Sequence, residues 1–201
     1  MCKEFNLTLI YLSSLAVFGI PNNKNVTLLS QKLPFNYYGQ SKNYVDNYLK
    51  ENICKNHIFS LLPASIISDS ENNFYVKLKK FMRYKIIKII FYLLCPGGQF
   101  NFCYSDDIAK EIIKIIKSNP ERLDKDILPS NKFHEIFISN GLYIKEIFYE
   151  ANNFFPIFTL PSLNIKLVKM LFFYLSPKLL LRMIFLLSKV SYKKIDSNLI
   201  K

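Results

Sequence analysis

Apolar residues follow two alternating patterns along this chain. Short, nearly continuous apolar runs predict β-strands at Leu7–Phe18, Ile58–Leu62, Phe100–Tyr104 and Phe133–Ile138. Apolar positions that repeat with the period of a helix predict helices at Tyr38–Lys55, Phe74–Leu94, Asp106–Lys117 and Tyr143–Asn152. The first run is nearly all apolar, which is typical of a strand buried on both faces of a parallel sheet. Strands that alternate with helices indicate an α/β fold with a parallel sheet.

Polar residues, glycine and proline separate these segments. The sequence predicts a loop at Asn22–Pro34, a polar turn at Asp69–Asn73 and a turn at Asn140-Gly141. A chain of 201 residues corresponds to one domain, or a domain and a half.

The apolar segment Leu7–Ile20 resembles the central part of a secretory signal peptide, since it follows Lys3. However, Glu4 weakens the positive charge at the start, and no small-x-small cleavage motif follows the segment. A buried strand that continues into a loop is therefore the interpretation that these residues favour.

Residues 163–190 are also strongly apolar. A spanning helix needs ~20 predominantly apolar residues, and here basic residues and a proline interrupt the run: Lys166, Lys169, Pro177, Lys178 and Arg182. The pattern predicts two amphipathic helices with basic faces. Two interpretations stay open: the helices pack on a domain core, or they dock on an anionic membrane surface.

Composition excludes several kinds of site. The chain has only 5 glycines, and neither Gly-x-Gly-x-x-Gly nor Gly-x-x-x-x-Gly-Lys occurs, so it carries no glycine-rich phosphate loop of its own. Its 4 cysteines and 2 histidines form no Cys-x-x-Cys or His-x-x-x-His pair, and we expect no metal site. We interpret the cysteines as reduced thiols of a cytoplasmic protein.

The net charge of +12 suggests an anionic partner. A compositional bias toward Lys, Asn, Ile, Tyr and Phe, which AT-rich codons specify, explains the same charge without selection for binding. The basic stretch Lys77–Lys88 is accompanied by no nucleic-acid module. We therefore interpret it as a solvated helix face and expect no nucleic-acid partner.

Four residues suggest chemistry at the end of the first strand. Ser13 and Ser14 end the apolar run, and Tyr38 and Lys42 open the next predicted helix. Parallel α/β sheets bind ligands at the carboxyl ends of their strands. Tyr38 and Lys42 are four residues apart, so they lie on one face of the helix.

These residue types suit proton transfer. A phenol loses its proton only near pH ~10, but an adjacent ammonium group favours the phenolate. A serine hydroxyl nearby can hydrogen-bond to a substrate hydroxyl or carbonyl group. Together the three groups could pass a proton to or from a carbinol while a hydride leaves its carbon.

The surrounding motifs resemble the extended short-chain dehydrogenase/reductases, the group of NAD-dependent sugar epimerases and dehydratases. That family has a strand ending in Ser-Ser or Ser-Thr, then Val-Tyr-Gly, then Pro-Tyr-x-x-Ser-Lys. The corresponding segments here are IYLSSLAVFG at residues 10–19 and NYYGQSK at residues 36–42. LLPASII at residues 61–67, GGQFNFCYSDDIA at residues 97–109 and ISNG at residues 138–141 resemble later family elements.

The resemblance implies roles for individual residues. Ser14 stands five residues before Gly19 and aligns with the catalytic serine or threonine, and Tyr38 aligns with the catalytic base. Lys42 aligns with the lysine that also contacts the nicotinamide ribose. The implied cofactor-lining residues are Ser13, Tyr38, Lys42, Pro63, Ala64 and Ser65. The implied cofactor is NAD or NADP.

The family's dinucleotide-binding half, with its Gly-x-x-Gly-x-x-Gly turn, is absent from this sequence, which starts just before what would be the fifth strand. The expected fold is therefore α/β, with the C-terminal part of a Rossmann-type parallel sheet and a small, mostly helical substrate subdomain. We expect a partial Rossmann-like catalytic portion in residues 1–140, with substrate-subdomain insertions at about 65–100, and a mainly helical substrate-binding portion in residues 141–201.

The resemblance implies an NAD(P)-dependent epimerase, dehydratase or reductase that acts on a nucleotide-linked sugar and is weakly active or inactive alone. The implied partners are a nucleotide-sugar-like molecule and either a complementing N-terminal half or a second copy. The alternative is a non-catalytic remnant, or a basic amphipathic module that contacts a membrane peripherally through residues 163–190.

Overall fold

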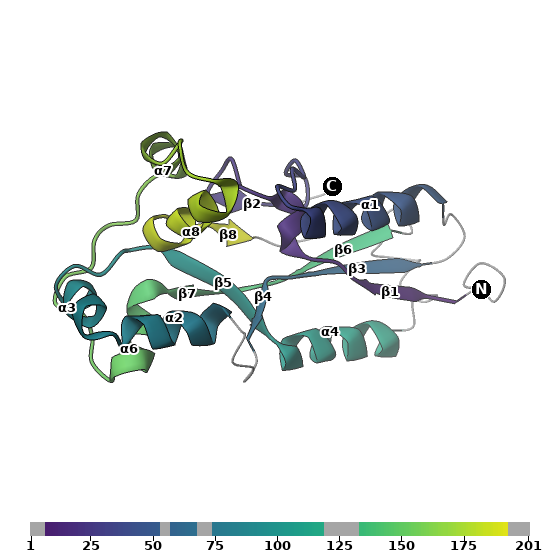
Figure 1. Cartoon of the computed structure of the whole chain (residues 1–201). Helices are drawn as coiled ribbons and strands as arrows, with labels where there is room; N and C mark the ends of the chain where they lie inside the picture. The colour runs from purple at the N-terminus through teal and green to yellow at the C-terminus, as the bar shows by residue number, and fades with distance from the viewer. Residues whose placement is uncertain (1–6, 53–56, 68–73, 119–132, 193–201) are drawn as a thin grey trace.

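The computed structural model describes residues 7–52, 57–67, 74–118 and 133–192 (Figure 1). The strands are β1 (Leu9–Leu12), β2 (Asn25–Val26), β3 (Ile58–Pro63), β4 (Ser65–Ile67), β5 (Gln99–Tyr104), β6 (Phe133–Ile138), β7 (Asn140–Tyr143) and β8 (Ser191–Tyr192). The helices are the 3₁₀ helix η1 (Leu15–Phe18) and α1 (Tyr37–Asn52), α2 (Phe74–Met82), α3 (Lys85–Leu93), α4 (Ser105–Lys117), α6 (Ile144–Asn152), α7 (Ile165–Leu171) and α8 (Pro177–Leu187).

The first sheet is parallel and has the strand order β1-β3-β6. In its register Leu12 lies opposite Leu61, and Leu61 lies opposite Ile136. Helix α1 covers one face of this sheet and α4 covers the other (Figure 1). Since successive side chains of a strand point to opposite faces, Leu61 packs with Ile108 and Ile115 of α4, whereas Leu62 joins the core beneath η1.

The second sheet has the order β4-β5-β7, with β5 parallel to β4 and antiparallel to β7. Two chain segments cross from the first sheet into the second. Ala64 is the single residue between β3 and β4, and Ser139 is the single residue between β6 and β7. The Ala64 amide donates a hydrogen bond to the carbonyl oxygen of Ile138 over 3.0 Å, so the two crossings lie side by side.

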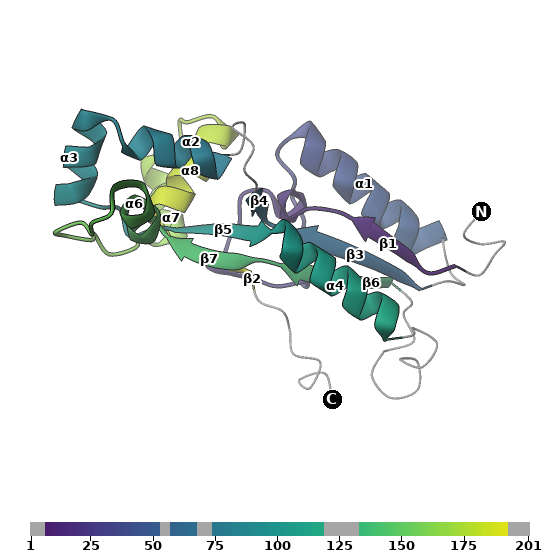
Figure 2. The ribbon, with the colours of Figure 1, turned by 90° about the horizontal axis from the view of Figure 1, so that it is seen from below.

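Helices α2, α3 and α6 gather at the far end of the second sheet (Figure 2). Their shared core includes Met82, Phe91, Phe100, Ile147 and Phe148, all of them buried. This helical end and the first sheet therefore have separate hydrophobic cores, joined through β4, β5 and the crossings.

Residues 163–190 form α7 and α8, and the short strand β8 that follows pairs with β2. Ile165, Val168, Ile184 and Val190 are buried in the core that also contains η1. The inner faces of these helices thus pack on the domain, which was one of the two interpretations of this segment. Within the described ranges, no helix combines the length and apolarity needed to cross a membrane.

The prediction of one strand over Leu7–Phe18 was wrong. Strand β1 ends at Leu12, and η1 follows because the Ser14 side chain accepts a hydrogen bond from the Ala16 amide and caps the helix. β1 is also not buried on both faces: it pairs with β3 alone among the described strands, and Leu12 is 42% exposed.

The predicted turn at Asn140-Gly141 was also wrong. Both residues belong to β7, where Asn140 lies opposite Phe102 and Gly141 lies opposite Asn101. Pairing with β5 overrides the local turn preference. The stretch Phe74–Leu94 divides into α2 and α3, because Tyr84 is extended (φ −60°, ψ 132°).

Strands β2, β4 and β8 were not predicted, because two or three residues are too few to show a period, and β2 lies within the predicted loop Asn22–Pro34. The other predicted strands and helices are confirmed, with ends that differ by a few residues. The predicted turn at Asp69–Asn73, together with Cys2 and Cys54, lies outside the described residues.

Candidate active site

The first turn of α1 is fixed by two local contacts. The Asn36 side chain accepts a hydrogen bond of 2.7 Å from the Gly39 amide and so caps the helix. Gly39 lies against η1, where an added Cβ would be 2.6 Å from the carbonyl oxygen of Ala16. Glycine at this position lets α1 approach η1 closely, which brings Tyr38 next to the end of β1.

The two serines at the end of β1 have different surroundings. Ser13 is 1% exposed, and its amide donates to the Leu61 carbonyl over 2.8 Å, which continues the sheet. Ser14 is half-buried, and its hydroxyl oxygen accepts the Ala16 amide hydrogen at 3.2 Å. The Ser14 hydroxyl therefore retains its own proton as a donor toward the cavity described next.

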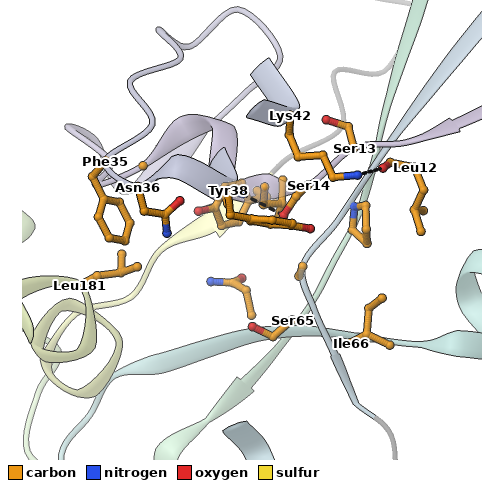
Figure 3. A pocket seen from close by; sticks show the side chains of 17 residues that line it. Leu12, Ser13, Ser14, Phe35, Asn36, Tyr38, Lys42, Ser65, Ile66 and Leu181 are labelled. Atoms are coloured by element: carbon orange, nitrogen blue, oxygen red, sulfur yellow. Dashed lines mark hydrogen bonds between the residues drawn. The ribbon is translucent and has the colours of Figure 1, made fainter. Parts of the chain in front are cut away.

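A cavity of about 440 Å³ lies where β1, α1 and the β3–β4 crossing meet (Figure 3). All the residues predicted from the sequence line it: Ser13, Ser14, Tyr38, Lys42, Pro63, Ala64 and Ser65. The structure thus brings together residues from three separate segments. Their roles in catalysis and cofactor binding remain predictions.

Lys42 crosses from α1 to the end of β1. Its ammonium group donates a 2.7 Å hydrogen bond to the Leu12 carbonyl oxygen (Figure 3). The same nitrogen lies 5.9 Å from the centre of the Tyr38 ring and 4.9 Å from the centre of the Tyr11 ring. A fixed positive charge therefore stands beside the phenol, as the sequence spacing predicted.

A buried carboxylate lies one helical turn after Lys42. Asp46 is 1% exposed and accepts hydrogen bonds of 2.7 Å from the hydroxyls of Ser13 and Ser60. The Lys32 ammonium lies 3.7 Å from the same carboxylate and also forms an ion pair with Glu135. Asp46 thus ties α1 to β1 and β3 directly beneath the candidate site, a connection that the sequence analysis missed.

Several further cavity residues were not identified from the sequence: Phe35, Asn36, Ile66, Asn101, Leu181 and Tyr192. Asn101 is 6% exposed, and its amide donates to the Val190 carbonyl over 3.1 Å. Asn101 stands between two phenylalanines in the strand QFNFCY, and this polar residue at an apolar position was the available signal, since buried polar groups need partners. The sequence around Tyr192 contains no comparable indication that this residue reaches the cavity. In the structure, burial raises the pKa of Tyr192 to about 12.

The two histidines, Asp107 and the two described cysteines make contacts within the fold and do not line the cavity. The ring of His57, which directly precedes β3, stacks 5.9 Å from the ring of His134 in β6. Asp107 accepts the Tyr104 amide hydrogen at the start of α4. Cys95 and Cys103 are buried free thiols, and burial raises the pKa of each to about 11. The part of the chain that the structure describes contains no group of three His, Cys, Asp or Glu residues suited to a metal ion.

Similarity to known proteins was found by comparing structures and not by comparing sequences. No protein-family model matches the sequence, and no curated protein matches it significantly. Solved structures do match. Helicobacter pylori ADP-L-glycero-D-manno-heptose-6-epimerase superposes with a TM-score of 0.53 at 17% identity, over 80% of this chain and 50% of the epimerase. A dTDP-4-dehydrorhamnose reductase from Clostridium acetobutylicum also gives 0.53, at 13% identity, over 98% of this chain and 59% of the reductase.

A third match is UDP-glucuronic acid 4-epimerase from Bacillus cereus in complex with NAD, with a TM-score of 0.51 at 15% identity, over 80% of this chain and 52% of the epimerase. Each match spans roughly half of the solved protein. These structural neighbours are two epimerases and one reductase, and one of the epimerases was solved in complex with NAD. They confirm the predicted fold class, a Rossmann-type parallel sheet with a smaller subdomain, and the resemblance at the level of the fold.

Proposed function

We propose that this chain provides the catalytic and substrate-binding portion of an NAD(P)-dependent epimerase, dehydratase or reductase that acts on a nucleotide-linked sugar. One observation carries the proposal: Ser14, Tyr38 and Lys42 line a single cavity at the carboxyl end of a parallel strand. That edge of the sheet is where α/β proteins bind their ligands.

In the proposed chemistry Tyr38 exchanges a proton with a hydroxyl oxygen of the sugar. Its ring is 55% exposed, so its hydroxyl is accessible to a ligand in the cavity. The Lys42 ammonium lies 5.9 Å from the centre of this ring, so a positive charge and a hydrogen-bond donor stand beside the proposed sugar oxygen. The Ser14 hydroxyl donates to the same sugar oxygen and positions it, since serine supplies a donor as well as acceptors.

The cavity suits the nicotinamide end of the proposed cofactor. Lys42 supplies a donor for a ribose hydroxyl, and the uncharged segment Pro63–Ser65, which runs from a buried proline to an exposed serine, supplies a wall for a flat ring. The sequence contains no glycine-rich turn for a diphosphate. When bound, the nicotinamide supplies the acceptor or donor of a hydride, which none of the amino-acid side chains can provide.

The diphosphate end of the cofactor requires a further protein segment. Among the described strands, β1 pairs with β3 and no strand occupies its other side. We place a complementing dinucleotide-binding segment at this edge; a second copy would have the same sequence and would also lack the glycine-rich turn. We expect the isolated chain to have weak or no activity, and the completed protein to work in the cytoplasm with a sugar nucleotide.

The proposal is tested by binding, because binding at the cavity does not depend on the missing part. The probes are nicotinamide mononucleotide, which lacks the second nucleotide, and UDP-glucuronic acid. Ligand-detected NMR with the full chain should show both molecules bound, and Lys42→Met should abolish binding of nicotinamide mononucleotide. Lys50→Met is the matched control, since Lys50 is an exposed lysine near the other end of the same helix.

Tyr38→Phe should leave binding of both probes intact and lower any turnover of the complemented protein about 10²- to 10⁴-fold. Tyr37→Phe is the control, because Tyr37 is the preceding residue, is 90% exposed and does not line the cavity. Absence of binding of both probes to the wild-type chain, or equal binding by Lys42→Met, would argue against the proposed site.

A further inference from the structure

Helix α3 exposes most of its apolar surface. Seven of its nine residues are apolar, but only Phe91 is buried. Ile86, Ile89 and Ile90 are 72%, 51% and 50% exposed. The helix lies at the opposite end of the molecule from β1, so neither the candidate site nor the unpaired side of β1 explains this exposure (Figures 1 and 2).

The segment 154–160 extends the same surface. The Ile157 amide donates to the Tyr92 carbonyl over 2.7 Å, and the Cys95 amide donates to the Phe158 carbonyl over 2.9 Å. Phe155, Ile157 and Phe158 are 56%, 53% and 64% exposed. We call α3 and residues 154–160 together the α3 surface. Monomeric soluble proteins rarely expose continuous apolar surface of this kind without a partner.

A hollow of about 510 Å³ lies within the α3 surface. It is lined by two lysines and four apolar or aromatic residues: Lys85, Lys88, Ile89, Tyr92, Phe154 and Phe155. The Lys88 ammonium lies 4.9 Å from the centre of the Phe154 ring. The hollow therefore combines an aromatic lining with two positive charges, which suits a ligand that has an apolar part and an anionic part.

The α3 surface carries positive charge and no acidic residue, since the acidic residues at this end of the molecule, Glu146 and Glu150, lie on α6. Residues 72–105 contain six lysines and arginines and no aspartate or glutamate, and residues 151–195 also contain no acidic residue. Helix α4 makes the contrast clear. It exposes Ile113 and Ile116 as well, but it carries Asp106, Asp107 and Glu111.

We propose that the α3 surface docks on an anionic lipid bilayer, with α3 lying in the plane of the interface. Ile86, Ile90 and Leu93 follow one helix face and would enter the boundary of the acyl chains. Lys85, on the neighbouring face, would contact lipid phosphates. Lys88 lies farther round the helix, beside Phe154, and adds positive charge to the same surface. Charge complementarity favours a bilayer over a second copy, since two α3 surfaces in contact would place lysines of like charge together.

The test is co-sedimentation of the full chain with vesicles. Vesicles of phosphatidylcholine and phosphatidylserine in equal parts should bind the protein, and added salt should weaken the binding. Vesicles of phosphatidylcholine alone should bind about tenfold or more weakly. The double variant Lys85→Glu/Lys88→Glu should lose about tenfold or more in affinity for anionic vesicles, and Ile86→Ser/Ile90→Ser should lose affinity for them as well.

Matched controls come from α4. Lys110→Glu/Lys117→Glu and Ile113→Ser/Ile116→Ser change exposed residues of the same types on the other helix. They should bind vesicles like the wild type, and circular dichroism should show all four variants folded. Equal binding by the α3 and α4 variants would overturn the proposal. The proposal would also fail if the wild type did not bind anionic vesicles. A dimer in light scattering that only the α3 substitutions dissociate would likewise overturn it. Neither result bears on the binding of nicotinamide mononucleotide at the cavity.

Discussion

Helices α1 and α4 cover opposite faces of the same parallel sheet, and they hold it by different means (Figure 1). Helix α4 packs through isoleucines such as Ile108 and Ile115, which meet Phe59 and Leu61 in a purely apolar layer. Helix α1 buries only Gly39, Asp46 and Leu49. Its contact with the strands is mainly polar: the Asp46 carboxylate accepts two serine hydroxyls, and Lys42 donates to the Leu12 carbonyl oxygen.

The difference shows which side of the sheet carries the candidate site. Apolar contacts are not directional, so α4 can stabilise the sheet without fixing any side chain to within a fraction of an ångström. Hydrogen bonds are directional, and those of Asp46 fix the height of α1 above β1 and β3. Lys42 lies one turn before Asp46 and Tyr38 lies two turns before it, so this anchor also positions them.

Asp46→Ala should have the largest effect on the free energy of unfolding, because it leaves the Ser13 and Ser60 hydroxyls and the Lys32 charge without the carboxylate. We expect a loss of about 4 kcal/mol in urea unfolding. Asp46→Asn keeps one acceptor oxygen and should cost roughly half as much. A loss below about 1 kcal/mol for the alanine variant would show that the polar anchor is dispensable.

On the opposite face, Ile115→Ala should lower the free energy of unfolding by about 3 kcal/mol, because it opens a cavity beside Phe59 and Leu61. Ile115→Val should cost about 1 kcal/mol. Binding of nicotinamide mononucleotide should be unchanged in both folded variants. The exposed neighbour Ile116, at 66% exposure, gives the control, since Ile116→Ala should change stability by less than about 0.5 kcal/mol. If the folded Ile115→Ala variant lost binding of nicotinamide mononucleotide, the α4 face would affect the cavity as the α1 face does, and the proposed difference between the two faces would be wrong.

Gly39→Ala should separate α1 from η1, because the new methyl group meets the Ala16 carbonyl oxygen at 2.6 Å. Alanine is the better helix former, but this clash with backbone should dominate and cost about 2 kcal/mol. Ligand binding should fall as Tyr38 moves away from Ser14. Gln40→Ala, at the next and exposed position, should alter neither property. A Gly39→Ala variant that is more stable than the wild type would mean that η1 moves away from α1 without loss of stability.

The smallest effect concerns Tyr192 and appears only in alkali. Burial raises its pKa to about 12 in the folded chain, above the value of about 10 in an unfolded chain. The buried neutral phenol therefore contributes stability that is complete below pH ~10 and is lost as the pH rises toward ~12. Tyr192→Phe should lose less stability than the wild type between these pH values in urea titrations. Parallel pH profiles for the two proteins would contradict this.

The sequence was sufficient for the part of the site that depends on local spacing. Tyr38 and Lys42 share a helix face because they are four residues apart, and Ser14 ends a strand whose apolar character is visible in the sequence. Asn101 and Tyr192 reach the same cavity from distant segments. Nothing in their immediate neighbours specifies that approach, which depends on how the second sheet and β8 pack.

The same distinction explains the errors in the fold. The strands β3 and β6 are long enough for their apolar runs to dominate, and both were predicted. Asn140-Gly141 has the composition of a turn, but the hydrogen bonds of β5 hold it extended. The end of β1 was misjudged because the apolar residues of η1 continue the run, and only the capping contact of Ser14 marks the change.

The crossings at Ala64 and Ser139 give the molecule a mechanical axis. Each crossing is one residue long, and the bond from the Ala64 amide to the Ile138 carbonyl clamps the pair together. The end of α8 bridges the same boundary, since the Gly98 and Gln99 amides donate to the Leu186 and Ser188 carbonyls, so any swing of the helical end would take place about this line and repack α8. Since Pro63 and Ser65 flank that line, a swing would widen or narrow the mouth of the cavity while leaving its floor in place.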